Sequence, residues 1–312
     1  MRTKGQIKAA ILVAALAAAG CSSNDETGTS SQNSAKVRPI SMTNTSTPIG
    51  AGDKALNDWA SKTGPVSFAD GEAAYHAGKY GEATKVFERY AVEKPNNAWG
   101  HFMLGLSAWK GGDLAKAEMA FEEALRIDPD HTKSLMNLSR VLIEQRRFDD
   151  AIAKLTHASE IDTNSAEVNR LMGRTYQDQG KIDDAEAAYR RAIALDGKDA
   201  WSMNNLGFLF LEQGRPGDAL PVLAKAVELR KDVPTFHNNL GMALEHSGRF
   251  AAAAAEYNSA LAADPGYEKA KRNLARVEAV KVNAEEPFDL EVTAKGFPDG
   301  TSVPVNETTK DQ

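Results

Sequence analysis

Residues 98–131 read AWGHFMLGLSAWKGGDLAKAEMAFEEALRIDPDH, and this stretch predicts one complete structural unit. Apolar side chains recur three and four residues apart up to Trp109 and again from Leu114, as in helices that bury one face. Gly112 stands between the two stretches, where a helix ends with a left-handed residue. Pro129 follows the second stretch and prevents its continuation. The segment therefore predicts two helices joined by a tight turn.

The same unit recurs along the chain with a period of 34 residues. Two positions of the unit carry small side chains, which is expected where two helix backbones approach closely. They are Ala83, Ala117, Ala151, Ala185, Ala219 and Ala253 in the second helices, and Gly71, Gly105, Ser139, Gly173, Gly207, Gly241 and Ala275 in the first helices. The repeats run 64–97, 98–131, 132–165, 166–199, 200–233 and 234–267, and an amphipathic helix at 268–282 closes the array.

This pattern resembles the tetratricopeptide repeat over residues 64–267. Beyond the small residues, an aromatic position of the second helix and a proline between repeats also recur: Phe87, Phe121, Tyr189 and Tyr257, and Pro95, Pro129 and Pro265. The resemblance implies an all-α fold, a right-handed α-solenoid of six helix-turn-helix repeats plus a C-terminal capping helix. It also implies that the first helix of each repeat lines a concave face.

Repeat 3 departs most from this pattern. Ser139 replaces the glycine of the first helix, Arg146 the glycine of the turn and Thr163 the proline. Repeat 5 has its proline later, at Pro234. We expect both repeats to keep their helical pair, with a wider or kinked turn.

The N-terminus carries the features of a secretory signal. Three basic residues precede an apolar run at 9–19, which is too short to span a bilayer stably. The run ends at AAGC, residues 18–21, which resembles the bacterial lipobox, although Ala18 stands where the family usually has an aliphatic residue such as leucine. We expect a lipoprotein signal peptide at 1–20 and a lipid anchor on Cys21, the only cysteine. The alternative is a plain signal peptide followed by an unmodified cysteine.

Ser22 after the cysteine favours the outer membrane, by resemblance to lipoprotein sorting in diderm bacteria. The expected location is therefore the outer membrane, lipid-anchored, on the periplasmic face. Residues 21–63 hold the lipidated cysteine and a segment rich in Ser, Thr, Asn and Gly, which predicts a flexible tether. The tail at 283–312 is expected to be mostly disordered. Within it Phe288, Leu290 and Val292 alternate like one short strand.

Charge and motifs disfavour several classes of function. The chain carries a formal net charge of −6, and loss of the basic signal peptide makes it more negative. Such a chain is a poor candidate for sequence-independent nucleic-acid binding. No zinc-protease motif, Cys/His cluster or glycine-rich phosphate loop is recognisable. We therefore predict no enzyme activity, no cofactor, no metal, no nucleic-acid partner and no small-molecule substrate.

The candidate binding residues are those that the repeat register places on the concave side of the first helices. They change from aromatic and apolar through basic to amide along the array: Phe68, Trp99, Phe102, Leu106, Trp109, Met136, Asn137, Arg140, Arg170, Arg174, Asn204, Asn205, Phe208, Asn238 and Asn239. The aromatic group suits apolar side chains of a peptide. Arg170 and Arg174 lie four apart and can reach one carboxylate, and asparagine suits a peptide backbone. The alternative is that these residues pack or pair within the array.

The predicted function is that of a membrane-anchored scaffold which binds a protein or peptide partner in its concave groove. Lipoproteins of this build resemble the pilotins and the tight-adherence (Flp) pilus assembly lipoproteins. This resemblance implies help in assembling an envelope machine such as a pilus or a secretin. The alternative is a regulatory adaptor of a periplasmic cell-wall enzyme.

Overall fold

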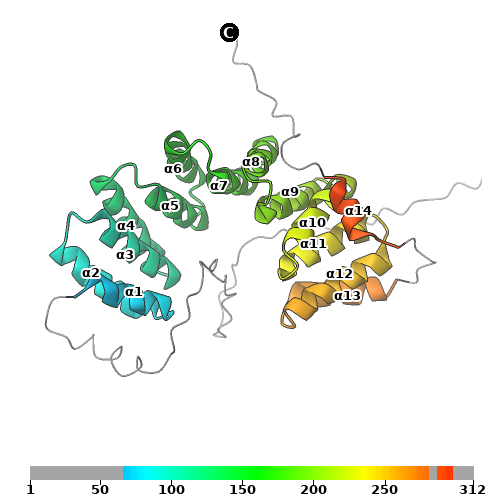
Figure 1. The fold of residues 1–312 in the computed structure, drawn as a ribbon, viewed down its shortest axis with the longest axis horizontal. Helices are drawn as coiled ribbons and strands as arrows, with labels where there is room; N and C mark the ends of the chain where they lie inside the picture. The colour runs from blue at the N-terminus through cyan, green and yellow to red at the C-terminus, as the bar shows by residue number, and fades with distance from the viewer. Residues whose placement is uncertain (1–65, 281–286, 298–312) are drawn as a thin grey trace, which may run out of the picture. The chain divides into compact units, whose positions relative to one another are not determined.

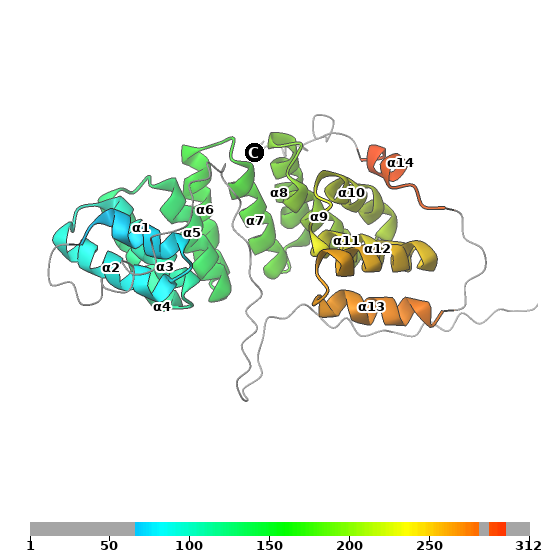
Figure 2. The same ribbon diagram turned by 60° about the horizontal axis from the view of Figure 1, so that its bottom comes forward.

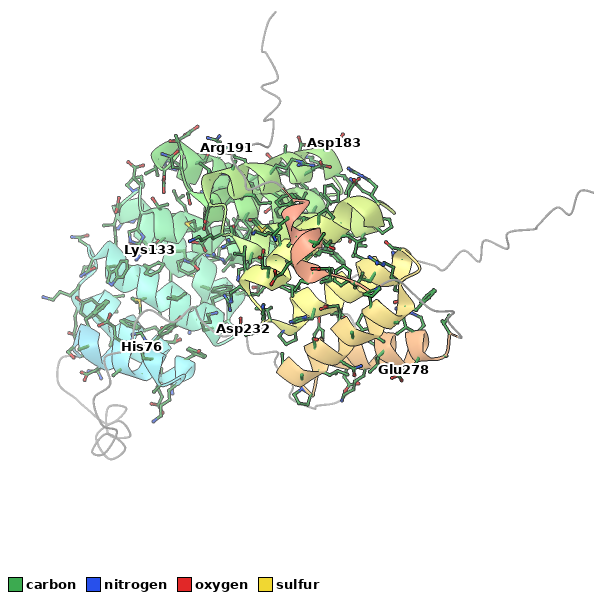
Figure 3. All side chains as sticks on the ribbon, turned by 45° about the vertical axis from the view of Figure 1, so that its right-hand side comes forward. His76, Lys133, Asp183, Arg191, Asp232 and Glu278 are labelled. Carbon is green, nitrogen blue, oxygen red and sulfur yellow. The ribbon has the colours of Figure 1, made fainter. Side chains whose placement is uncertain are left out.

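The computed structural model describes residues 66–280 and 287–297, which form fourteen α-helices and no strand. The helices are α1 (Phe68–His76), α2 (Tyr80–Glu93), α3 (Ala98–Lys110), α4 (Leu114–Ile127), α5 (Thr132–Glu144), α6 (Phe148–Ile161), α7 (Ala166–Asp178), α8 (Ile182–Leu195), α9 (Ala200–Glu212), α10 (Pro216–Leu229), α11 (Pro234–His246), α12 (Phe250–Ala263), α13 (Glu268–Glu278) and α14 (Leu290–Lys295). The predicted solenoid of six helical pairs with the capping helix α13 is confirmed. Figure 3 labels His76 at the end of α1 and Glu278 at the end of α13.

The two helices of each repeat pack against each other, and the first helices of consecutive repeats also touch. Figure 1 shows this for α5, α7 and α9, which lie next to one another with α6 and α8 on the other side. We call the side formed by α1, α3, α5, α7, α9, α11 and α13 the first-helix face, and the side formed by the second helices the outer face.

The small residues of the first helices make room for an aromatic ring of the second. A Cβ at Gly105 would lie 2.7 Å from the ring of Phe121, and one at Gly173 would lie 2.6 Å from the ring of Tyr189. In repeat 3 the equivalent ring is absent, because Leu155 takes its place. Ser139 is buried there, and its Oγ donates to the carbonyl of Leu135 at 2.7 Å. A hydroxyl with a local acceptor is therefore tolerated at this position.

The turn of repeat 3 differs from the expectation. Arg146 adopts a φ of 61°, in the left-handed region that Gly112 occupies with a φ of 86°. The N–H of Arg147 donates to the carbonyl of Leu142 at 2.8 Å, and the equivalent bond in repeat 2 is 2.9 Å long. The prediction of a wider or kinked turn is wrong here, because the arginine accepts the left-handed conformation and closes the same turn. In repeat 5, Pro234 begins α11, where a proline loses no helical hydrogen bond.

The C-terminal segment is a helix where a strand was expected. Asp289 caps α14, accepting a hydrogen bond from the N–H of Val292 at 3.0 Å. The helix packs on α10, and Ala294 and Phe297 join the core around repeats 5 and 6 (Figures 1 and 2). The strand prediction is wrong, and residues 287–297 are an ordered part of the tail that was expected to be mostly disordered.

Other predicted segments lie outside the described residues. They are the signal peptide, Cys21, the tether up to residue 63, and the tail residues 283–286 and 298–312. Over the ranges that the structure describes, every helix is too short or too polar to cross a membrane.

Candidate functional site

Trp99 offers an accessible indole at the start of α3. The side chain is 37% exposed, and its ring centroid lies 4.9 Å from that of Phe102 and 5.5 Å from that of His131. The ammonium group of Lys133 lies 4.8 Å from the same ring, a cation–π contact. Phe102 beneath it is only 5% exposed. Trp99 therefore fits a binding role, whereas Phe102 belongs to the core, which corrects its expected role.

Trp109, near the end of α3, is half-buried. Its Nε1–H donates to Oε1 of Glu144 in α5 at 2.9 Å, and the ammonium of Lys110 lies 4.5 Å from its ring. Leu106, one turn earlier, is also half-buried. Leu106 and Trp109 are therefore less accessible than Trp99 on the same helix.

The remaining apolar candidates also divide into buried side chains and side chains that are at least partly exposed. Phe68 in α1 is half-buried, with its ring centroid 5.3 Å from that of Phe87. Met136 is buried and packs in the core of repeats 3 and 4, so it is not a contact residue. Phe208 in α9 is half-buried. Trp201, which occupies the position of Trp99 three repeats later, is 40% exposed and is a further accessible indole.

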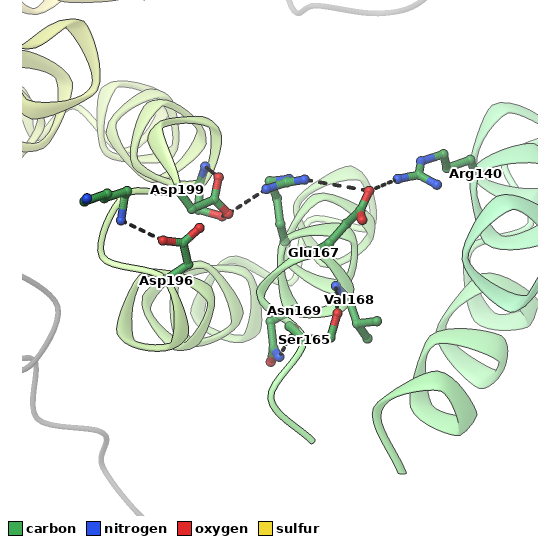
Figure 4. Close-up of polar contacts among 10 residues, drawn as sticks. Arg140, Ser165, Glu167, Val168, Asn169, Asp196 and Asp199 are labelled. Carbon is green, nitrogen blue, oxygen red and sulfur yellow. Dashed lines mark hydrogen bonds and ion pairs between the residues drawn. The ribbon is translucent and has the colours of Figure 1, made fainter. Parts of the chain in front are cut away.

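A chain of ion pairs joins α5, α7 and α9 (Figure 4). Glu167 of α7 pairs with Arg140 of α5 and lies 3.9 Å from Arg170 Nη2. Arg170 Nη1 donates to Oδ2 of the buried Asp199, the N-cap of α9, at 2.6 Å. Burial lowers the pKa of the Arg140 guanidinium, and its attraction to Glu167 opposes this shift. Arg140 and Arg170 therefore hold neighbouring repeats together.

Arg174 is the accessible arginine of this region. Its side chain is 61% exposed, and its Nε lies 3.9 Å from Oδ2 of Asp178 on the same helix. Arg170, four residues earlier, bonds to Asp199 instead. The two arginines therefore pair with different acids within the array, and the prediction that both are available to one carboxylate of a partner is corrected. Of the two arginines, only Arg174 has a largely exposed side chain.

Asn204, Asn238 and Asn239 of repeats 5 and 6 are buried, and each bonds to an asparagine of a neighbouring first helix. Asn239 Nδ2 donates to Asn204 Oδ1 at 2.9 Å, and Asn273 Nδ2 donates to Asn238 Oδ1 at 2.9 Å. Buried amides need such partners, and the neighbouring first helix supplies them. The prediction that Asn204, Asn238 and Asn239 contact a peptide is corrected, because these side chains link α9, α11 and α13.

Two further asparagines also bond within the array. Half-buried Asn205 accepts a bond from Asn204 at 3.4 Å. Asn137 donates to the carbonyl of Lys133 at 2.8 Å and accepts from Arg140 at 3.1 Å. Their amide groups therefore support the first helices.

Several of the side-chain bonds between first helices share a register that the sequence analysis missed. Four of them join side chains 35 residues apart, one more than the repeat: Trp109 and Glu144, Gln177 and Glu212, Asn204 and Asn239, Asn238 and Asn273. In each pair, the partner therefore stands one position after the residue that is equivalent to the first member in the next repeat. A search for complementary polar pairs at this spacing would have found them.

Metal ligands do not gather in the described part of the chain, where no group of three His, Cys, Asp or Glu side chains could hold an ion.

Comparisons with known proteins agree with this fold. Tetratricopeptide-repeat family models match residues 164–232 and 204–268. A model of the middle TPR-like domain of cilia and flagella-associated protein 70 matches residues 70–196. No curated protein matches the chain. Over these repeats, the chain is a tetratricopeptide-repeat protein.

Solved structures show the same fold at low sequence identity. A tetratricopeptide-repeat protein from Parabacteroides merdae superposes with a TM-score of 0.60 at 16% identity, over 72% of this chain and 90% of that one. A thermophilic one from Thermus thermophilus gives 0.51 at 18%, over 59% and 100%. A chain of the APC/C hetero-tetramer Cut9–Hcn1 gives 0.59 at 16%, over 72% of this chain and only 45% of that longer one. These likenesses show the fold alone.

Proposed function

We propose that this protein is a lipid-anchored adaptor that binds a protein or peptide partner on its first-helix face. The observation that carries the proposal is the set of accessible anchors on that face. Trp99 and Trp201 expose more than a third of their surface, and Arg174 exposes more than half. Tryptophan and arginine are the residues that most often dominate binding energy at protein interfaces. The tetratricopeptide repeat is a scaffold typical of protein–protein interaction.

The anchor belongs to the proposal as well. The motif at 18–21 supports lipidation of Cys21, and Ser22 supports the periplasmic face of the outer membrane. Acyl chains on one residue hold a protein at a bilayer, which raises the local concentration of the array near a membrane partner. This arrangement suits a role in assembling an envelope machine such as a pilus or a secretin. A Cys21→Ser form is then found in the soluble periplasm, and its retention in the membrane argues against the anchor.

Partner capture with surface variants tests the binding face. Trp99→Ala combined with Trp109→Ala removes two anchors while leaving the buried Phe102 in place. The matched control is Met119→Ala, because Met119 is a large apolar side chain 71% exposed on α4 of the outer face. We expect the Trp variant to lose the partner that the unaltered protein and the Met119 variant both enrich from envelope extracts. Equal enrichment by all three contradicts the assignment.

The identity of the captured partner then separates the two roles. A pilus or secretin subunit supports the assembly role, and a cell-wall hydrolase or synthase supports the regulatory alternative.

A further inference from the structure

The outer face of α10 differs from that of the other second helices. Ala224 is fully buried, although α10 lies on the outer side of the array. The equivalent residues of the other repeats are polar and at least partly exposed: Glu88, Glu122, Thr156, Arg190 and Asn258. One turn earlier Pro221 is partly covered, whereas its equivalents Lys85, Met119, Ala153, Ala187 and Ala255 are exposed. Repeat 5 therefore has a small, apolar and covered outer surface.

The segment 287–297 covers this surface. α14 lies along α10 in both views (Figures 1 and 2), and Ala294 and Phe297 are buried. The backbone approaches closely, since a Cβ on Gly296 would lie 3.6 Å from the Cβ of Pro221. At the other end of the segment, the guanidinium of Arg249 lies 5.5 Å from the ring of Phe288. The small side chains of α10 thus leave room for the segment that packs on them.

The helical structure of this segment depends on its contacts with the array. A helix of six residues is not stable in water by itself, so α14 is helical because it is docked. Four apolar side chains anchor it, Phe288, Leu290, Ala294 and Phe297, whereas Val292 on the same helix is largely exposed. Short elements near a chain end open at a lower free energy than the core helices that carry them. Each opening of the segment uncovers Pro221 and Ala224.

We propose that the outer face of α10 is a helix-docking surface, and that residues 287–297 of the same chain are its exchangeable occupant. The surface lies on the side opposite to the first-helix face, so the inference does not depend on the proposed function. Because the segment is covalently joined to the array, its effective concentration is in the millimolar range. A free helix of the same chemistry enters only when the segment is released.

A peptide-exchange experiment tests this inference. Leu290→Asp with Phe297→Asp, made in the mature chain, releases the segment by placing charges at its apolar contacts. The probe is a fluorescent peptide of the native sequence 287–297, PFDLEVTAKGF. We expect it to bind the released variant about tenfold or more tightly than the unaltered protein, whose own segment competes. Equal binding to both proteins, or binding to neither, overturns the proposal.

Matched substitutions locate the site. Ala224→Arg, added to the released variant, abolishes peptide binding, because the arginine fills the docking surface. Thr156→Arg occupies the equivalent exposed position of repeat 3 and leaves binding unchanged. Binding that survives Ala224→Arg places the peptide elsewhere and refutes the assignment. Far-ultraviolet circular dichroism verifies that each variant keeps its helices.

Hydrogen exchange in the unaltered protein provides a test that does not depend on whether a variant folds. We expect the amides of α14 to exchange faster than those of α10, through a local opening. If both helices exchange together, only on global unfolding, the segment is a fixed part of the array and the proposal fails. If the unaltered protein is instead a dimer that Phe297→Asp converts to a monomer, the occupant comes from a second copy, which also refutes exchange within one chain.

Discussion

At the scale of single residues, the turn between the two helices accepts different side chains at a conformational cost. Glycine occupies the left-handed position in repeats 1, 2, 4, 5 and 6, and Arg146 occupies it in repeat 3. The left-handed conformation costs a residue with a Cβ about 1–2 kcal/mol. The backbone hydrogen bonds of the turn are the same in both cases, so the two residues differ in backbone preference and in the contact of the Arg146 guanidinium with the ring of Phe148, 5.6 Å away.

Reciprocal substitutions at this position measure that cost. A Cβ added at Gly112 meets no atom within 4 Å, so Gly112→Arg adds only conformational strain. We expect it to lower the free energy of unfolding by about 1 kcal/mol and Arg146→Gly to raise it by a similar amount. Urea denaturation gives both values. A loss of stability in Arg146→Gly would show that the arginine side chain contributes more than its backbone costs.

His237 links the stability of repeat 6 to pH. The buried ring lies between two acceptors, Glu256 Oε2 at 2.7 Å from Nδ1 and the Lys231 carbonyl at 3.0 Å from Nε2. Burial by itself lowers the pKa of His237, but the hydrogen bonds to Glu256 and Lys231 outweigh it and raise the pKa above its usual range. Folding therefore favours the protonated ring, which donates from both nitrogens, more than the unfolded chain does.

The sign of the pH effect follows from this raised pKa. The stabilisation by His237 is fully present below the unfolded pKa of about 6.5 and is lost as pH rises through the folded value. We expect the stability difference between the unaltered protein and His237→Gln to shrink as pH increases above about 6.5. His246→Gln, at an exposed site of the same repeat, serves as the control for the substitution itself. A difference that grows with pH contradicts the assignment.

At the scale of helices, periodicity in the sequence predicts the twelve paired helices well. Each helix buries one face, and the apolar residues of that face recur three and four positions apart. The candidate site is predicted less well. The register places Asn204 and Asn238 correctly on the first helices, but their bonding partners lie in the next repeat. The segment at 288–292 alternates like a strand, but it is a helix because it packs against α10. Such packing between distant parts of the chain cannot be predicted from the local sequence pattern.

The asparagine links between helices can be measured by a double-mutant cycle. Asn239→Ala leaves the Oδ1 of buried Asn204 without its donor, so we expect a loss of about 1–3 kcal/mol in the free energy of unfolding. Asn204→Ala with Asn239→Ala should cost less than the sum of the single changes, because the two share one bond. Asn137→Ala is the control, since its amide donates within its own helix. Additive costs for Asn204 and Asn239 argue against the link.

At the scale of the molecule, the two faces of the array present different surfaces. Ion pairs and buried amides fix neighbouring first helices to one another, so the accessible residues Trp99, Trp109 and Arg174 are carried on a connected scaffold. On the outer face, the segment 287–297 covers the apolar surface of α10. We therefore propose two separate roles: the first-helix face binds another protein, and the outer face of α10 is a docking surface whose occupant is this chain.

Site-specific photo-crosslinking tests the binding face most directly. A photoreactive amino acid is placed at Trp109 on the first-helix face or, as the control, at Met119 on the outer face, and the cells are irradiated. The account predicts a crosslink from position 109 to one envelope protein and none to that protein from position 119. A crosslink to the same partner from position 119, with none from position 109, would contradict it.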